Sequence, residues 1–235
     1  MKKLLLILIA AAGLARAEDP PHVEVSLYCF QYAPEAKTVA VRTGDASYAD
    51  VTLSTANITG PVQAALTDGR VTLHRRVEGP KGEITWPVIG SAKLPDKLTR
   101  ALLVLLPPAS GSGETYRCAL IDYTDAAFPY GSYRVANLSP FPVRGAIGKS
   151  YVELKSAAMG TIKPQGEPGE VQPSRFEFQD NNRWNLLTET RCAVRNDRRW
   201  LLCIYRDPDS GRMNLRCIPD RVPQVVATTA TGAKE

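Results

Sequence analysis

Strand patterns dominate this chain, and no helical pattern competes with them. Short runs rich in Val, Ile, Leu, Thr and Tyr recur between turn clusters, and no stretch of about 12 residues after the first 17 shows a helical stripe. The one helical element expected is a short turn over residues 95–100. The expected strands are 22–31, 37–43, 49–55, 70–77, 84–89, 101–106, 115–123, 131–137, 141–146, 150–154, 158–163, 174–178, 184–194, 199–206 and 213–219.

The spacing of these strands predicts an all-β fold, an antiparallel β-sandwich of the immunoglobulin-like kind. Residues 107–113, rich in Pro, Gly and Ser, divide the chain into halves that each approach the size of one sandwich. One large sandwich and two small packed sandwiches both fit this pattern. The expected organisation is an N-terminal β region over 18–108 and a C-terminal β-sandwich region over 109–221.

The first 17 residues have the pattern of a cleavable signal peptide. Lys2 and Lys3 precede an apolar run over 4–14, and an Ala-x-Ala site follows at residues 15–17. Because the apolar run is too short for a permanent membrane anchor, we expect an exported protein of the periplasm, cell envelope or extracellular space with no membrane span. Residues 222–235 are small and polar, which predicts a flexible tail.

Removal of this segment changes the charge of the protein. Lys2, Lys3 and Arg16 take three positive charges out of a formal net charge of +5, which leaves +2. A nearly neutral mature chain gives no reason to expect binding to nucleic acid.

Five cysteines follow the signal segment, and their spacing lacks the paired C-x-x-C character of zinc and redox motifs. The turn formers at 207–211 predict a hairpin between 199–206 and 213–219, with a turn centred near Ser210. That centre places Cys203 opposite Cys217, where a cross-strand disulfide is feasible. The alternative is that all five are small buried hydrophobic residues.

One stretch carries a local resemblance to known proteins. Residues 128–139, Phe-Pro-Tyr-Gly-Ser-Tyr-Arg-Val-Ala-Asn-Leu-Ser, are followed by Val143–Gly148 and Val152–Leu154. This stretch resembles one found in uncharacterised exported bacterial β-sandwich proteins, over about residues 128–154. The resemblance implies a β-sandwich and export, and it implies no active residue.

The sequence offers little for catalysis or metal binding. The mature chain has two histidines, His22 in the lead-in segment and His74 on an expected solvent face. No G-x-S-x-G elbow and no copper-type cluster of His, Cys and Met occurs. We therefore expect no cofactor, no metal and no catalytic residues, although distant carboxylate pairs cannot be judged by spacing.

Arginine is the residue type in excess near the C-terminus. Between residues 175 and 221, ten arginines stand against seven acidic residues. Arg191, Arg195, Arg198 and Arg199 surround an expected turn at 196–197, beside Trp200. Such a tip can bind an anionic partner, and it can equally be a solvated hairpin end that resists edge pairing.

These observations favour a non-enzymatic, exported β-sandwich protein that serves as a structural or binding module. Its hairpin loops, above all 195–199 and 207–212, would contact an envelope protein partner or an anionic polymer. The alternative is a secreted hydrolase acting on polysaccharide or ester substrates.

Overall fold

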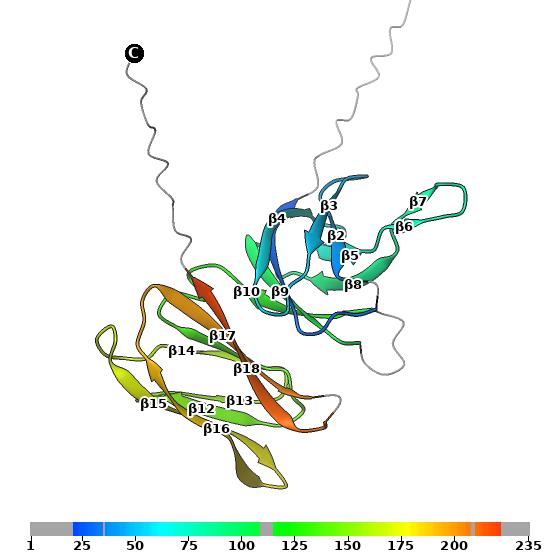
Figure 1. Ribbon diagram of the computed structural model, residues 1–235. Helices are drawn as coiled ribbons and strands as arrows, with labels where there is room; N and C mark the ends of the chain where they lie inside the picture. The colour runs from blue at the N-terminus through cyan, green and yellow to red at the C-terminus, as the bar shows by residue number, and fades with distance from the viewer. Residues whose placement is uncertain (1–20, 35, 109–114, 208–209, 222–235) are drawn as a thin grey trace, which may run out of the picture.

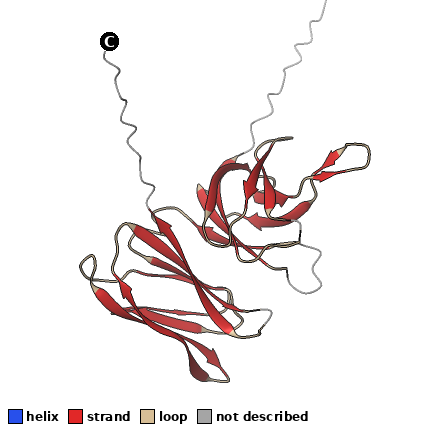
Figure 2. Ribbon diagram, in the orientation of Figure 1, coloured by secondary structure: helices blue, strands red, loops and turns tan. Residues whose placement is uncertain are grey.

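A computed structural model describes residues 21–34, 36–108, 115–207 and 210–221. Within these ranges the protein is all-β, with no helix, and its largely antiparallel sheets pack together as β-sandwiches (Figures 1 and 2). The expected fold class is therefore confirmed. The expected helical turn at 95–100 is wrong: this segment is a tight turn in which the Leu98 amide donates to the Pro95 carbonyl. The expected signal peptide and tail lie outside the described residues.

Four four-stranded sheets and one small hairpin make up the structure. The inner N-terminal sheet has the order β10-β9-β1-β4, and the outer N-terminal sheet has the order β3-β2-β5-β8. Their strands are β1 (His22–Cys29), β4 (Thr59–Ala65), β9 (Arg100–Leu106), β10 (Arg117–Asp122), β2 (Thr38–Arg42), β3 (Tyr48–Thr52), β5 (Arg70–His74) and β8 (Val88–Lys93). The strands β6 (Val77–Glu78) and β7 (Ile84–Thr85) form a hairpin that projects from this part of the molecule (Figure 1).

The C-terminal half repeats this two-sheet arrangement. The inner C-terminal sheet has the order β14-β11-β17-β18, and the outer C-terminal sheet has the order β13-β12-β15-β16. Their strands are β11 (Tyr133–Asn137), β14 (Met159–Ile162), β17 (Arg198–Arg206), β18 (Met213–Arg221), β12 (Val143–Ile147), β13 (Ser150–Leu154), β15 (Val171–Asp180) and β16 (Arg183–Ala193). Each inner sheet contains one parallel pair, β1 with β9 and β11 with β17.

Three apolar cores separate the four sheets. Side chains alternate along a strand, so a strand buried on both faces is apolar at nearly every position. In β9, Leu103 and Leu105 enter the core of the N-terminal sandwich, whereas Leu102 and Val104 enter a second core shared with the inner C-terminal sheet. A third core fills the C-terminal sandwich. The four sheets are thus stacked through continuous packing, with the two inner sheets face to face.

The strand order moves the expected boundary between the two regions. β10 pairs with β9, so residues 107–116 connect two strands of one sheet and do not link two domains. The chain passes from the N-terminal to the C-terminal sheets between Asp122 and Tyr133. The division at 108/109 is therefore wrong, because a loop rich in Pro and Gly suits a long hairpin connection as well as a linker.

β4 has no counterpart among the expected strands. Gly60 and Pro61 resemble a turn, yet they lie in an edge strand where a missing amide hydrogen is tolerated. Gly60 has a φ of +107°, and a Cβ there would lie 3.0 Å from the Val25 carbonyl oxygen. The register shift between Val25 and Leu27 of the partner strand lies at the same place. No helix of the described residues is both long and apolar enough to cross a membrane.

Candidate functional site

The segment between β16 and β17 is not the expected hairpin, because β16 belongs to the outer C-terminal sheet and β17 to the inner one. This segment is also less cationic than its sequence suggests. Arg195 and Arg198 both bind the carboxylate of Asp197, with nitrogen–oxygen distances of 2.8 and 2.7 Å. Hydrogen bonds from Arg195 and Arg198 hold the pKa of Asp197 well below its usual range. Arg191 is exposed on β16. Two of the four arginines that were expected to bind an anionic partner therefore share the single negative charge of Asp197.

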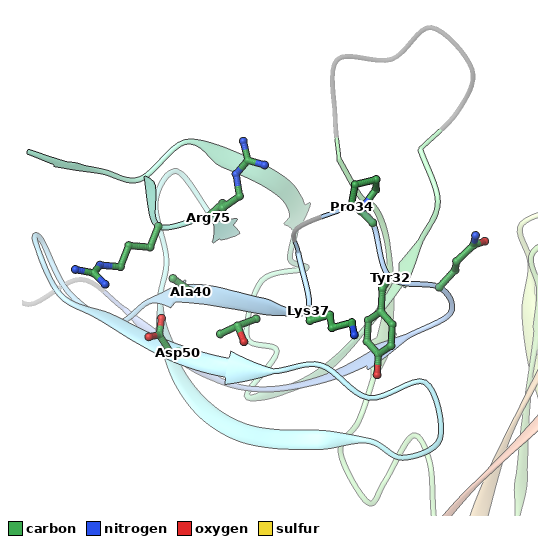
Figure 3. Close-up of a pocket in the computed structure, with 10 residues that line it drawn as sticks. Tyr32, Pro34, Lys37, Ala40, Asp50 and Arg75 are labelled. Atoms are coloured by element: carbon green, nitrogen blue, oxygen red, sulfur yellow. The ribbon is translucent and has the colours of Figure 1, made fainter. Parts of the chain in front are cut away.

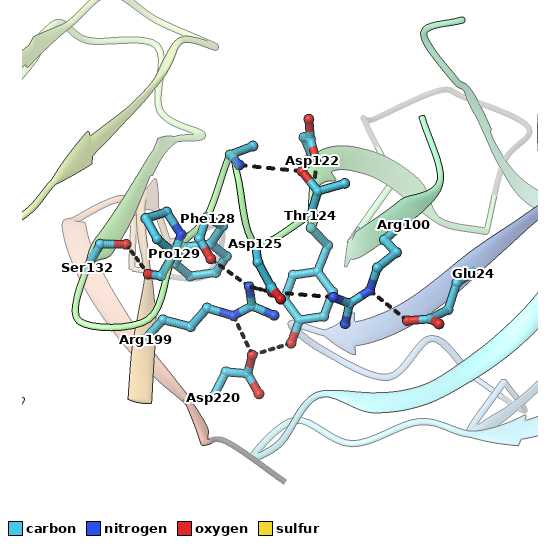
Figure 4. A network of polar contacts seen from close by, with 12 residues as sticks. Glu24, Arg100, Asp122, Thr124, Asp125, Phe128, Pro129, Ser132, Arg199 and Asp220 are labelled. Atoms are coloured by element: carbon cyan, nitrogen blue, oxygen red, sulfur yellow. Dashed lines mark hydrogen bonds and ion pairs between the residues drawn. The ribbon is translucent and has the colours of Figure 1, made fainter. Parts of the chain in front are cut away.

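Arg199 is not exposed beside Arg195 and Arg198, so its expected place in an exposed arginine cluster is wrong. Its side chain is 1% exposed because the alternation of β17 turns it, with Leu201 and Cys203, toward the inner N-terminal sheet. Its Nε donates to Asp220 at 2.7 Å, and its Nη1 donates to Asp125 at 3.1 Å (Figure 4). Aromatic rings flank the guanidinium, those of Tyr123, Phe128 and Tyr130.

This network joins the two sandwiches. Arg100 of β9 binds Glu24 of β1 at 2.9 Å and Asp125 at 3.3 Å, so Asp125 lies between Arg100 and Arg199 (Figure 4). Burial and the neighbouring Asp220 carboxylate raise the pKa of Tyr123, and its hydroxyl therefore stays protonated and donates to Asp220. Arg199 therefore has a structural role at the contact between the two sandwiches.

Trp200 points in the opposite direction from Arg199, toward the C-terminal core. Its ring stacks on Tyr133, with centroids 4.5 Å apart and an interplanar angle of 5°. Arg198 lies 5.9 Å from its centroid. With one ring face covered by Tyr133, Trp200 is chiefly a packing residue.

The expected pairing of Cys203 with Cys217 is wrong. In the β17–β18 register, Leu202 lies opposite Cys217 and Cys203 lies opposite Arg216. A shift of one residue puts two side chains on opposite faces of a sheet. Cys203 is therefore buried in the core that the two inner sheets share, the junction core, and burial raises the pKa of its thiol.

A cationic basin of about 730 Å³ lies beside the outer N-terminal sheet (Figure 3). Arg75 and Arg76 follow β5, and Lys37 precedes β2, so the three cations come from strand ends. Asp50 of β3 is the one carboxylate among the described lining residues. The lining consists of Gln31, Tyr32, Ala33, Pro34, Lys37, Thr38, Ala40, Asp50, Arg75 and Arg76.

Tyr116 holds the loop that forms one wall of this basin. Its buried hydroxyl accepts from the Ala33 amide at 2.8 Å and donates to the Ala36 carbonyl at 3.0 Å. Burial raises the pKa of Tyr116 to about 12, so the hydroxyl remains a donor. The Lys37 ammonium lies 5.6 Å from the centroid of Tyr32, which places both side chains at the rim.

His74 is buried on the outward face of the same sheet, so its expected exposure is wrong. Its Nδ1 lies 2.8 Å from the Trp86 carbonyl oxygen, and its Nε2 lies 2.8 Å from the Thr72 hydroxyl. Tyr48 covers the ring edge-on and stacks on Trp86. Both ring nitrogens are engaged, which is the pattern of a structural histidine. Among the described residues, no cluster of three or more His, Cys, Asp and Glu side chains forms a metal site.

A second hollow, the junction groove, runs between the two inner sheets. It comprises two adjoining cavities of about 190 and 630 Å³, which share Leu106, Arg117, Leu138 and Arg206. Arg216 also lines it and donates to the Phe30 carbonyl at 2.9 Å, with its guanidinium 4.7 Å from the Phe30 ring. The exposed arginines Arg117 and Arg206 are the groove's more accessible cations.

Shared lining residues connect the basin to the groove. A cavity of about 230 Å³ has Gln31 and Tyr32 in common with the basin, and Pro107 and Pro108 in common with the groove. We call this continuous surface the cationic track. Its described cations are Lys37, Arg75, Arg76, Arg117, Arg206 and Arg216, and its described carboxylates are Asp50 and Asp207.

Sequence reasoning missed most of this surface. Lys37, Arg76 and Arg117 lie far apart in the chain and form no charge cluster there. The one usable signal is that each stands at or next to the end of a strand, where loops from several strands meet. Arg206 borders the 207–212 loop, which was expected to supply contacts.

A comparison with protein-family models finds no matching family, and a comparison with curated proteins finds no match.

Proposed function

We propose that this protein is an exported, non-enzymatic binding module of the cell envelope or periplasm that holds an anionic polymer along the cationic track. The observation that carries the proposal is the charge of the track: six described cations against two described carboxylates. Because the mature chain is almost neutral, this imbalance is a local concentration of positive charge. The signal-like first 17 residues support export.

The track has the chemistry that a polymer bearing carboxylate or phosphate groups requires. Guanidinium groups bind either anion through paired hydrogen bonds, and clefts lined by one sign of charge concentrate the opposite sign. The aromatic and proline side chains of the wall, Tyr32, Pro34, Pro107 and Pro108, add apolar contact surface for a polymer backbone. An open surface of this kind suits an extended ligand.

The lining gives less support to the alternative of a secreted hydrolase. Glycoside hydrolysis requires two carboxyl groups facing one another across the substrate. Each cavity of the track has at most one carboxylate among its described residues, Asp50 in the basin and Asp207 in the junction groove.

An envelope protein partner is the second candidate, and one observation favours it. The junction groove runs along β10, the last strand of its sheet; β8 lies beside its N-terminal end, and the rest of this edge has backbone groups with which an added strand can pair. Its wall here is partly apolar, formed by Ala119, Leu120, Leu138 and Met159. An extended peptide segment could bind here without using the basin.

Binding measurements on the mature protein, residues 18–235, test the proposal. The probes are a polyuronate and an inorganic polyphosphate, with a neutral glucan as a negative control, each titrated by calorimetry at two salt concentrations. We expect saturable binding to at least one polyanion that weakens as salt increases.

Three double variants that each remove two positive charges make the test specific. Lys37→Ser/Arg76→Ser alters the basin and Arg117→Ser/Arg206→Ser alters the junction groove, whereas Arg195→Ser/Arg198→Ser alters the segment between β16 and β17, where Asp197 offsets part of the positive charge. We expect each of the first two to weaken binding about tenfold or more, and the third to have little effect. Equal loss in all three variants, or no binding by the native protein, would contradict the proposal. If only the Arg117→Ser/Arg206→Ser variant loses binding, and the native protein retains an envelope protein, the second candidate would be favoured.

A further inference from the structure

The free edges of the two C-terminal sheets lie close together at β16 and β18. These are the last strands of their sheets, and they bring Cα atoms within 8 Å of one another. At the opposite edge, the chain itself joins β13 to β14, which belong to different sheets. At the β16–β18 edge the described chain makes no such direct connection.

One cysteine from each of these strands points into the space between the sheets. Cys192 of β16 packs against the C-terminal core, opposite the buried Gln172. Cys217 of β18 lies opposite Leu202, which belongs to the same core. The Cys217 residue is exposed along the edge strand, and desolvation and the neighbouring Cys192 raise the pKa of its thiol to about 11.

Tyr133 lies near both thiols. Burial, and after it the neighbouring Cys192 and Cys217 side chains, raise the pKa of Tyr133. The three side chains therefore meet in one part of the core, beside the Tyr133–Trp200 stack.

The other three cysteines are not placed to form a disulfide with one another. Cys29 and Cys118 both lie opposite Leu105, one on each side of β9. Two strand spacings, about 9.5 Å, separate their Cα atoms, which is beyond the reach of a disulfide. Cys203 points into the junction core, on the other face of the sheet from Cys217.

We propose that Cys192 and Cys217 form a disulfide that closes the β16–β18 edge of the C-terminal sandwich. In the structure the sulfur atoms of Cys192 and Cys217 are not bonded to each other. In the oxidation, a Cys192 or Cys217 thiolate attacks the disulfide of an oxidant, such as oxidised glutathione or a thiol–disulfide oxidoreductase. The second thiolate then attacks the protein sulfur of the mixed disulfide and displaces the oxidant's remaining thiolate. One protein S–S bond forms, the oxidant's S–S bond is broken, and the two protons from the cysteines pass to the oxidant, which departs as two thiols.

This inference goes beyond the proposed function and requires only an oxidising compartment or oxidant. Because buried thiols ionise poorly, the reaction is slow at neutral pH and faster at higher pH. A bond between residues 192 and 217 closes a loop of about 25 residues, which is expected to raise Tm by about 5–10 °C.

Peptide mapping of residues 18–235 provides the test. The protein is oxidised with glutathione at pH 8.5, alkylated under denaturing conditions and digested with trypsin without reduction. We expect three alkylated cysteines and one linked pair of peptides, Cys192–Arg195 with Cys217–Arg221. Five alkylated cysteines, or a link between other positions, would overturn the proposal.

Matched variants distinguish the effect of this disulfide from general effects on stability. Cys192→Ala and Cys217→Ala should each abolish the linked peptides and the loss of Tm on adding reductant, whereas Cys118→Ala should retain both. If a variant fails to fold, the mapping of the native protein still decides. A reductant-sensitive Tm that persists in Cys192→Ala would also contradict the proposed pair.

Discussion

Arg199 Nε lies 2.7 Å from Asp220 Oδ2, and this ion pair is buried where the two sandwiches meet. The partner side chain is 18% exposed, so both charges are largely withdrawn from water. Removing one member of such a pair leaves the other uncompensated, which commonly costs about 3–5 kcal/mol. The first prediction follows from this geometry.

We expect Arg199→Ala to lower the free energy of unfolding by about 3–5 kcal/mol. Arg199→Lys should recover only part of this loss, because one ammonium group cannot reach Asp220, Asp125 and the Phe128 carbonyl together. Urea unfolding of the purified variants measures the change. Arg198→Ala is the control and should change stability by less than about 1 kcal/mol, since its ion pair is exposed. Equal effects of Arg198→Ala and Arg199→Ala would contradict the structural role of Arg199.

Tyr116→Phe is expected to destabilise the protein by about 1–3 kcal/mol, because it leaves the Ala33 amide and the Ala36 carbonyl without their partner. It should also weaken polyanion binding, since the same loop positions Lys37. Tyr151→Phe removes an exposed hydroxyl and serves as the control. Calorimetric titration and thermal unfolding of both variants check the two effects. Unchanged polymer affinity in Tyr116→Phe would show that the loop's position does not matter for binding.

Glu177 should make stability depend on pH in the acidic range. Hydrogen bonds from Arg144 and Arg175 lower its pKa below the usual value of 4.5. Its stabilising contribution is therefore complete above about pH 4.5 and is lost as the pH falls through the lowered pKa. In urea unfolding at pH 6 and pH 3, we expect Glu177→Gln to be less stable than the native protein at pH 6, with a smaller difference at pH 3. A difference that is unchanged at the lower pH would argue against this ionisation.

Chain length should govern polymer affinity. If one molecule of polymer occupies the basin and the junction groove together, affinity for a series of defined oligomers should rise steeply once a chain spans both. The Arg117→Ser/Arg206→Ser variant should lose this rise and retain the affinity of the short oligomers for the basin. A smooth increase in affinity that is the same in both proteins would indicate that the two hollows bind independently.

The fold class and most strands could be predicted because alternation and turn residues are local signals. The β17–β18 hairpin shows what such signals can predict and what they cannot. The turn formers located the hairpin, but the assumed centre put Cys203 opposite Cys217, where the structure has Leu202. Local sequence does not fix register to a single residue, and register decides which face a side chain occupies.

The candidate site was harder to predict, because its residues come together only through the tertiary fold. Arg199 belongs to a conspicuous arginine-rich segment, yet its position in β17 directs it into the junction core. Lys37 and Arg117 stand in ordinary stretches of sequence and reach one continuous surface through Gln31, Pro107 and Pro108, which line adjoining hollows. Charge density along a chain is therefore a poor guide to charge density on its surface.

The junction core also bears on the proposed binding of a polymer. Residues of β9 and β17 belong to one packed cluster there, so the junction groove, whose walls come from both sandwiches, is held at a fixed place relative to the basin. A fixed spacing between the basin and the junction groove would select among ligands. A polymer whose charged groups repeat at an unsuitable interval could occupy one of these two hollows but not both. Selectivity among polyanions would then depend on the period of the ligand as much as on its charge.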